Sequence, residues 1–382
     1  MTRVNATDRR SRGRDELAPA IGVAVLAAVM TALALYGFFW IFPDRTDFRA
    51  RYNEGIAWRH GTDLYTPNPS LNTHPPTVTA LVFAPLSLLP YPAAQAVSTA
   101  LNGLAVIASV RVIARTLRLS TPQVVWMSGL LLATQGMIQH WAMGQFIGLL
   151  LYPVTKAWVA SRDGLNVTSG LWLAPVVAVK PPLALLALLL PWPTWVTAGA
   201  LSGGTSAIAV LLTGVEPWIA WLREGSKINW LAVPFNASLW GMAARWQQGN
   251  CWWIRMSELT PLSTAAVLIA GAGLAWHTLQ QSDRDRRFFC AGLWSVLLSP
   301  LGWAYYLPLV AGPATATWRR SSLAVIAYVL LLAPVGQNRP DAGLLAGSIM
   351  FTGVVCAWMA WTRASASSGG TSPTIPRRSC PS

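Results

Sequence analysis

The feature that most constrains the fold is a series of long apolar runs separated by short clusters of arginine. The chain has 382 residues, of which 53% are hydrophobic and 11% are charged, whereas a soluble domain carries roughly 25% charged residues. In lipid, backbone groups must hydrogen-bond within the protein, so runs of this kind cross a bilayer as helices. The sequence therefore predicts an all-α polytopic membrane protein.

The arginine clusters indicate the orientation of the chain in the membrane. A net charge of +14 can indicate a nucleic-acid partner, but these arginines lie between apolar runs, which is the positive-inside pattern. We therefore expect no nucleic acid as a partner and a multi-pass location in the plasma membrane, with both termini cytoplasmic. The residues expected on the cytoplasmic side are Arg111, Arg115, Arg118, Arg162, the run at 284–287, Arg319, Arg320 and Arg363.

The apolar runs form one membrane domain with a polar tail at each end. Residues 1–17 and 363–382 are expected to be disordered cytoplasmic tails, and residues 18–362 to be the transmembrane domain. We expect roughly 11–13 transmembrane helices. They fall near 18–42, 92–110, 122–138, 144–160, 165–179, 181–193, 195–214, 260–280, 288–302, 303–317, 321–335 and 343–362.

Residues 75–90 are apolar but short, and Pro85 interrupts them. A full span here would place the cluster at Arg111 outside the cell. An interfacial or re-entrant helix keeps that cluster inside, so we favour it on the positive-inside rule.

This topology places four polar segments together on the outer face: 43–74, 139–145, the turn at Lys180 and 215–258. Polar residues gathered at one membrane face are a functional-site hypothesis. The four cysteines at 251, 290, 356 and 380 show no paired spacing, so we expect neither a disulfide set nor a metal site.

Asp47 lies a few residues beyond the first predicted span, and Arg51 follows four residues later. In a helix this spacing puts both side chains on one face. Asp47 is then either a general base for a hydroxyl group or a solvated loop acid paired with Arg51. Asp44 completes a D-x-x-D pattern that is too common to argue for a metal.

Three more polar residues border apolar runs. His74 precedes two prolines that set an extended entry into a helix; it either contacts a phosphate or sugar hydroxyl or caps the helix start. Gln145 either satisfies free backbone groups at a helix start or holds a sugar hydroxyl. Lys180 lies between two apolar halves, and such a lysine needs an anion or water; it either binds a lipid phosphate or snorkels to the interface.

The segment at 229–246 offers Asn236, Ser238 and Arg245 among tryptophans. This mixture suits a sugar site, and the alternative is a tryptophan-rich interfacial belt. Two adjacent tyrosines, of which Tyr305 is the first, follow the break at 299–303; a plain hairpin between two spans is the alternative there.

Together these segments resemble the family 87 glycosyltransferases, the polyprenol-phosphate-mannose-dependent mannosyltransferase type of the GT-C superfamily. The resemblance covers about residues 18–335 and rests on an ordered set of short motifs. These are DFxxxY at 47–52, GTDLY at 61–65, HPP and APLSLLP within 74–90, GQ at 144–145, KPP at 180–182, NASLWG at 236–241 with Arg245, and SPxxW at 299–303.

The resemblance implies a GT-C type bundle with juxtamembrane helices on the outer face. It also implies a hexosyltransferase that works on that face. The enzyme would move a sugar, with mannose expected, from a polyprenyl-phosphate donor to a hydroxyl of a glycolipid or glycan acceptor, with inversion. Asp47 matches the expected base and Lys180 the position for the donor phosphate. No metal or other cofactor is implied. The substrate-binding candidates are Arg51, Tyr52, Tyr65, His74, Gln145, Lys180, Asn236, Ser238, Arg245 and Tyr305.

One departure from the family pattern concerns the last motif. The family often carries a histidine after SPxSW, whereas this chain has Tyr305 there and Gly302 in place of the serine. Two alternatives stay open: an arabinofuranosyltransferase using decaprenyl-phosphate arabinose, and a lipid or solute transporter or flippase. A transporter should show internal repeats and charges near mid-span, and the sequence shows neither.

Overall fold

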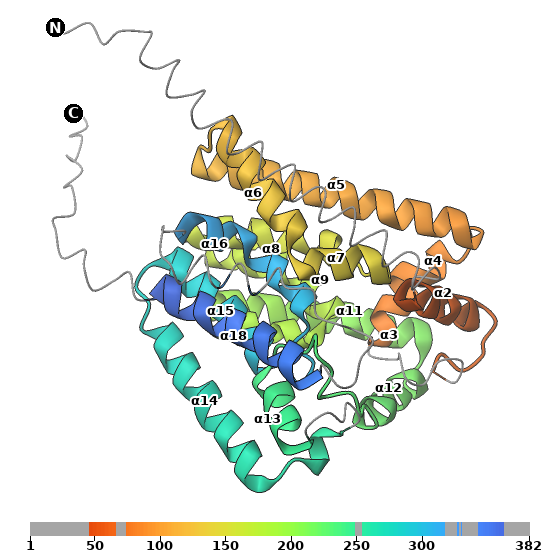
Figure 1. The fold of residues 1–382 in the computed structure, drawn as a ribbon. Helices are drawn as coiled ribbons and strands as arrows, with labels where there is room; N and C mark the ends of the chain where they lie inside the picture. Colours follow the sequence, from red (N-terminus) through yellow and green to blue (C-terminus); the bar gives the residue numbers. More distant parts are fainter. Residues whose placement is uncertain are drawn as a thin grey trace, which may run out of the picture.

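A computed structural model describes residues 46–65, 74–248, 254–317, 327, 330 and 343–362. Within these residues the regular elements are helices, and the two isolated β-bridges belong to no strand. The predicted tails at 1–17 and 363–382, the first predicted span at 18–42 and most of 321–335 lie outside the described residues. The all-α prediction is therefore confirmed for the part of the chain that is described (Figure 1).

Three helices in the described part are long and apolar enough to cross a membrane: α5 (Tyr91–Leu117), α11 (Trp192–Thr213) and α14 (Pro261–Leu279). Each has a proline in its first turn. Proline is tolerated there, because the backbone N–H that it lacks would have no hydrogen-bond partner within the helix. Their outward faces expose leucine and isoleucine side chains, as lipid-facing helices do. These helices indicate a membrane protein, and the larger number of spans stays a prediction.

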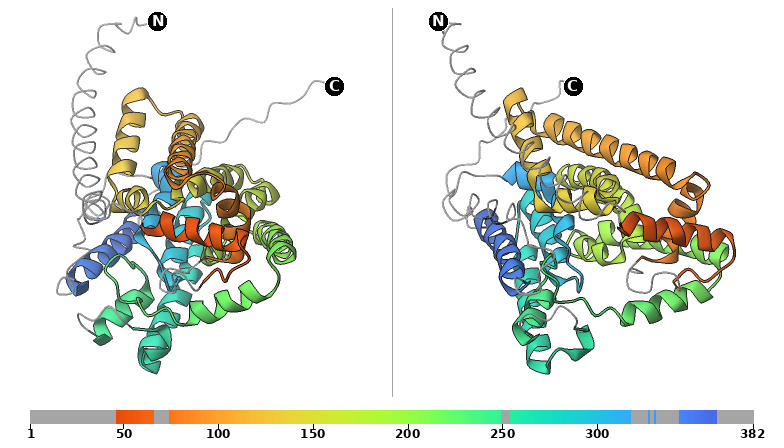
Figure 2. Two further views of the ribbon diagram at one scale, coloured as in Figure 1. Left: turned by 90° about the vertical axis from the view of Figure 1, so that its right-hand side faces the viewer. Right: turned by 45° about the vertical axis from the view of Figure 1, so that its right-hand side comes forward.

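The helices pack as two connected groups around a common apolar core (Figures 1 and 2). In the first, α8 packs against α5 and α9, and α9 packs against α11. In the second, α15 packs against α10, α14 and α16. The further bounds are α6 Thr121–Ala133, α8 Ile147–Arg162, α9 Asn166–Val179, α10 Ala184–Leu188, α12 Glu216–Ser226, α13 Leu239–Gln248, α15 Arg284–Leu298, α16 Ala311–Thr317 and α18 Gly343–Thr362.

Two predicted spans are interrupted in the structure. The span at 122–138 breaks at Thr134, where an extended backbone ends α6. The Thr134 hydroxyl caps the next helix, α7 (Gln135–Met143), because it accepts a hydrogen bond from the Met137 N–H at 3.3 Å. The span at 181–193 contains a 3₁₀ turn, η2 (Pro181–Leu183), and α10, and it ends where Pro191 precedes α11. Proline, which cannot continue a helix, explains the second break.

Residues 76–86 form a short helical segment beneath α2 (Thr46–Arg59). It consists of α3 (Pro76–Val78), the π-helical η1 (Thr79–Phe83) and α4 (Ala84–Leu86). Gly55 of α2 permits a close approach, because a Cβ there would overlap the carbonyl of Phe83. A short helix was expected here; its place at the membrane surface stays a prediction.

Candidate active site

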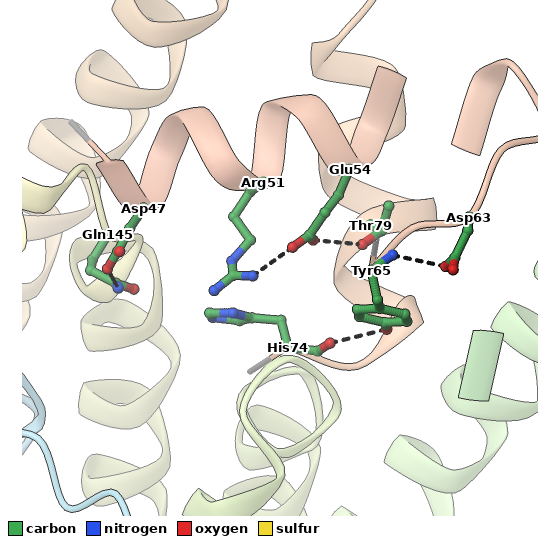
Figure 3. A network of polar contacts seen from close by, with 8 residues as sticks. All are labelled: Asp47, Arg51, Glu54, Asp63, Tyr65, His74, Thr79 and Gln145. Carbon is green, nitrogen blue, oxygen red and sulfur yellow. Dashed lines mark hydrogen bonds and ion pairs between the residues drawn. The ribbon is translucent and has the colours of Figure 1, made fainter. Parts of the chain in front are cut away.

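One face of α2 carries three ionisable side chains: Asp47 lies beside Gln145, Arg51 points toward His74, and Glu54 points toward Arg51 and Thr79 (Figure 3). The spacing of four and three residues puts them on one face of a helix. Arg51 forms a buried ion pair with Glu54 at 2.7 Å, and Glu54 also accepts from the Thr79 hydroxyl at 3.2 Å. The sequence reasoning missed Glu54, although its spacing of three from Arg51 is the signal that could have found it.

Asp47 is partly buried and accepts a hydrogen bond from the Gln145 side-chain amide. Gly144, which ends α7 in the left-handed region at φ 68°, turns the chain so that Gln145 faces α2. Burial raises the pKa of Asp47, while Arg51, the Gln145 hydrogen bond and Lys180 act in the opposite direction. Gln145 therefore positions the Asp47 carboxylate, and the ion pair that the structure describes for Arg51 is with Glu54.

His74 lies below Arg51 with its ring edge-on to Phe146 at 5.3 Å. Its backbone carbonyl accepts from the Tyr65 hydroxyl at 3.3 Å, which fixes the start of the segment at 76–86. Burial, together with the positive charges of Arg51 and Lys180, holds the pKa of His74 well below its usual value. His74 is therefore a neutral imidazole that can exchange hydrogen bonds without carrying charge.

Lys180 ends α9 and is 5% exposed. Its Nζ lies over three aromatic rings, with ring-centre distances of 5.2 Å to Phe146, 5.7 Å to Tyr306 and 5.9 Å to Tyr305. No carboxylate in the described ranges forms an ion pair with it. Aromatic faces stabilise an ammonium only weakly compared with a counter-ion. Burial, together with the positive charge of Arg51, holds the pKa of Lys180 well below its usual value, while Asp47 acts in the opposite direction. An anionic ligand would stabilise the charged form of this amine.

Tyr305 and Tyr306 come from the 3₁₀ helix η4 (Ala304–Val310), which packs against α7 and α8. Their rings meet edge to face at 4.9 Å. Gly136 lets α7 lie directly on the Ala304 carbonyl. The structure places Tyr305 beside Lys180, a contact that the sequence did not predict, and it adds Tyr306, which the sequence reasoning did not select.

Tyr52 and Tyr65 have contacts that hold the fold. The Tyr52 hydroxyl donates to the Leu89 carbonyl at 2.8 Å, and its ring packs against Phe48 and Tyr91. Both tyrosines are buried. They position α2 and His74, the elements that carry the ionisable cluster.

Asn236 and Ser238 tie the segment at 229–246 to the break at 299–303 through the Pro300 carbonyl, and Arg245 binds carbonyls within that segment. Asn236 Nδ2 donates to the carbonyls of Leu231 and Pro300, each at 2.8 Å. Arg245 Nη1 donates to the carbonyls of Val233 and Asn236, each at 3.0 Å, and the Ser238 hydroxyl accepts from the Gly241 N–H at 2.9 Å. All three side chains are buried. The structure gives them backbone partners and does not bring them against Asp47.

The predicted residues that do gather are Asp47, Arg51, His74, Gln145, Lys180 and Tyr305. They come from α2, the entry to α3, the turn after α7, the end of α9 and η4. The group combines a buried lysine, a neutral imidazole and one carboxylate, that of Asp47, which forms no ion pair with the residues that the structure describes. It can take a proton from a hydroxyl group while stabilising an anion nearby.

Comparison with known protein families gives one match: residues 72–300 match the family model described as Glycosyltransferase family 87. The matched range covers more than half of the chain and contains His74, Gln145 and Lys180, whereas Asp47 lies before it and Tyr305 after it. No curated protein and no solved structure matches the chain.

Proposed function

This chain belongs to glycosyltransferase family 87, and we propose on that basis that it transfers a sugar from a polyprenyl-phosphate donor to a hydroxyl of an acceptor, with inversion. That the protein is a glycosyltransferase follows from the family. The lipid-phosphate donor, with mannose as its sugar, and the outer-face location of the site are the proposal. Asp47 is the proposed base, and Lys180 the proposed partner of the donor phosphate.

The observation that carries this proposal is a carboxylate held next to a buried cation without being paired to it. Gln145 orients Asp47, and the ion pair of Arg51 is with Glu54. Lys180 contributes to the electrostatic environment of Asp47 yet has aromatic rings rather than a carboxylate around it. A base and an anion site that stay separate are what a one-step displacement requires.

The proposed step conserves atoms and charge. The acceptor oxygen forms a bond to the anomeric carbon, and the bond from that carbon to the phosphate oxygen breaks. Asp47 takes the hydroxyl proton, and the polyprenyl phosphate leaves with one more negative charge than it had in the donor. The Lys180 ammonium stabilises that additional charge, which is where preorganised electrostatics lower a barrier most.

The apolar helices suit a donor whose carrier stays in the membrane. A polyprenyl chain has the bilayer as its solvent, so its phosphate lies at the interface, near the ends of the spans. Lys180 lies at the end of α9, where Pro181 and Pro182 stop the helix. A nucleotide sugar would need a soluble binding domain, and the described helices contain no such unit.

A donor panel tests the proposal. Purified protein in nanodiscs is given labelled polyprenyl-phosphate mannose, decaprenyl-phosphate arabinose or a nucleotide mannose, with alkyl glycosides as acceptors. We expect transfer from polyprenyl-phosphate mannose and none from the nucleotide sugar. Transfer from the nucleotide sugar alone would contradict the proposal, and transfer from the arabinose donor alone would change the sugar but keep the donor class.

Lys180→Ala tests the phosphate contact. Hydrogen bonds to charged groups contribute about 1.5–3 kcal/mol, so the donor KM should rise roughly tenfold to a hundredfold. Lys156→Ala is the matched control, because Lys156 also lies over an aromatic ring, that of Trp172 at 5.6 Å, but in α8. An unchanged donor KM and kcat in Lys180→Ala would refute the assignment.

A further inference from the structure

A small cavity lies between α2, α5 and α7, beside the Gln145 amide that orients Asp47. Its volume is about 10 Å³, which is close to the space that one buried water molecule needs. The polar part of its lining comprises Ser98, Thr99 and Asn102 of α5, His140 of α7, and Gln145. The proposed mechanism gives this cavity no role.

Two buried polar atoms on the cavity wall form no hydrogen bond with the residues that the structure describes: the Ser98 hydroxyl and the side-chain oxygen of Gln145. Ser98 is 9% exposed and Gln145 is 5% exposed. The nitrogen of the Gln145 amide already donates to Asp47, so the oxygen is the atom left for a second contact. Because leaving a buried polar atom without a partner destabilises a fold, such atoms normally bind another group or an ordered water.

Size and charge select water as the molecule that fits the cavity. No aspartate, glutamate, lysine or arginine is among the described residues of the lining, so an ion there would have no counter-charge. The volume is too small for a sugar or a phosphate. A buried water needs two to four polar partners, and it can donate to the Gln145 oxygen while it exchanges a hydrogen bond with the Ser98 hydroxyl.

A donor on the Gln145 oxygen acts on Asp47 through the amide group. Linked hydrogen bonds polarise one another, so a bond accepted by the amide oxygen strengthens the bond that the amide nitrogen donates to the carboxylate. The same contact keeps the amide from turning its oxygen toward the carboxylate. Both effects favour the charged form of Asp47, which is the form that can take a proton.

We propose that this cavity binds one fixed water molecule, which bridges Ser98 and Gln145 and holds the Gln145 amide in the orientation that keeps Asp47 ready to accept a proton. Ser98 is then a positioning residue, because it acts on the base through the water and Gln145. The effect on the base rests on the proposed function, whereas the water site itself does not depend on it.

Other groups also act on the ionisation of Asp47, and the test must leave them unchanged. The ionisable groups around Asp47 and the cavity are Arg51 of α2, Lys180 at the end of α9, Tyr305 and Tyr306 of η4, and His140 on the α7 side of the cavity. The test therefore changes Ser98 alone, which carries no charge.

An experimental structure of the wild-type protein, at a resolution that shows ordered waters, tests the site directly. We expect one water within hydrogen-bond distance of both the Ser98 hydroxyl and the Gln145 side-chain oxygen. A structure of that quality with no water between these two atoms would overturn the proposal.

Ser98→Val tests the effect on the base, because its two methyl groups replace the hydroxyl and fill the cavity. The readout is the pH dependence of sugar transfer from polyprenyl-phosphate mannose. Without the water the charged form of Asp47 is less stable, so the fall in rate at low pH should move upward by about one pH unit, a tenfold change in the acid constant. A role of Ser98 in packing alone would not move this profile.

Ser98→Ala, which removes only the hydroxyl, covers the case in which Ser98→Val fails to fold, and it should move the profile in the same direction. Ser109→Ala is its matched control: Ser109 lies on the same helix but donates to the Ala105 carbonyl at 2.7 Å, and its profile should match the wild type. An unchanged profile in the folded Ser98 variants would overturn the role of the water. If the wild-type protein transferred no sugar from the lipid donor, the proposed function would fail, and the ordered water would still decide the site.

Discussion

Replacing Asp47 by asparagine removes the proposed base while keeping its shape. Asparagine retains an oxygen that can accept from the Gln145 amide, the hydrogen bond that orients residue 47, so α2 should keep its place. The variant also removes the negative charge of Asp47, which acts on Lys180 and opposes phosphate binding there. We therefore expect a donor KM that stays the same or falls, with the loss confined to turnover.

The expected loss follows from the role of a general base, which contributes typically 10²–10⁴-fold. At about 1.36 kcal/mol for each factor of ten, this corresponds to a barrier increase of about 3–5 kcal/mol. The assay is single-turnover transfer from the labelled lipid donor with saturating acceptor. Asp163→Asn, an exposed acid after α8, is the control and should keep wild-type turnover.

The pH dependence of the transfer rate gives a second test of Asp47. Burial raises the pKa of Asp47 above that of a free aspartate, and the base acts only when deprotonated. The rate should therefore fall as the pH drops through that raised pKa, and this limb should vanish in Asp47→Asn. A folded Asp47→Asn protein with near wild-type turnover and the same acid limb would refute Asp47 as the base.

Three other predictions concern structure. Glu54→Ala should lower the melting temperature strongly, because losing one partner of a buried ion pair costs about 3–5 kcal/mol. Glu224→Ala breaks a more exposed pair, with Lys227, whose side chain is 57% exposed, and should cost about 1 kcal/mol or less. Equal melting temperatures of the two variants would contradict this. Asn236→Ala should destabilise by about 1–3 kcal/mol for each buried carbonyl that it leaves unpaired and leave both KM values unchanged, so a selective rise in either KM would show a substrate contact instead. In a background without native cysteines, Ser226→Cys should react with an impermeant maleimide added to intact cells and Ser282→Cys should not, because the positive-inside rule places them on opposite sides; the reverse labelling would overturn the topology.

The sequence by itself determined the helical class, the places of the long apolar helices and the chemical types at the site. Hydrophobic runs and proline positions are local properties, so α5, α11 and α14 follow from them directly. Asp47 and Lys180 stood out for the same reason: a charge beside apolar runs is visible without knowing its neighbours. The spacing within α2 also predicted that Asp47 and Arg51 share one face, as they do.

Only the tertiary structure decided which partner each polar group has. Gln145 reaches Asp47 across 98 residues of sequence, Lys180 lies over rings that come from two distant segments, and Asn236 joins two loops by hydrogen bonds to backbone carbonyls. Arg51 pairs with Glu54 because both are buried on the same face of α2 and Thr79 adds a second hydrogen bond there. Such choices depend on which helices pack together, and periodicity along one helix carries no information about its neighbour's side chains.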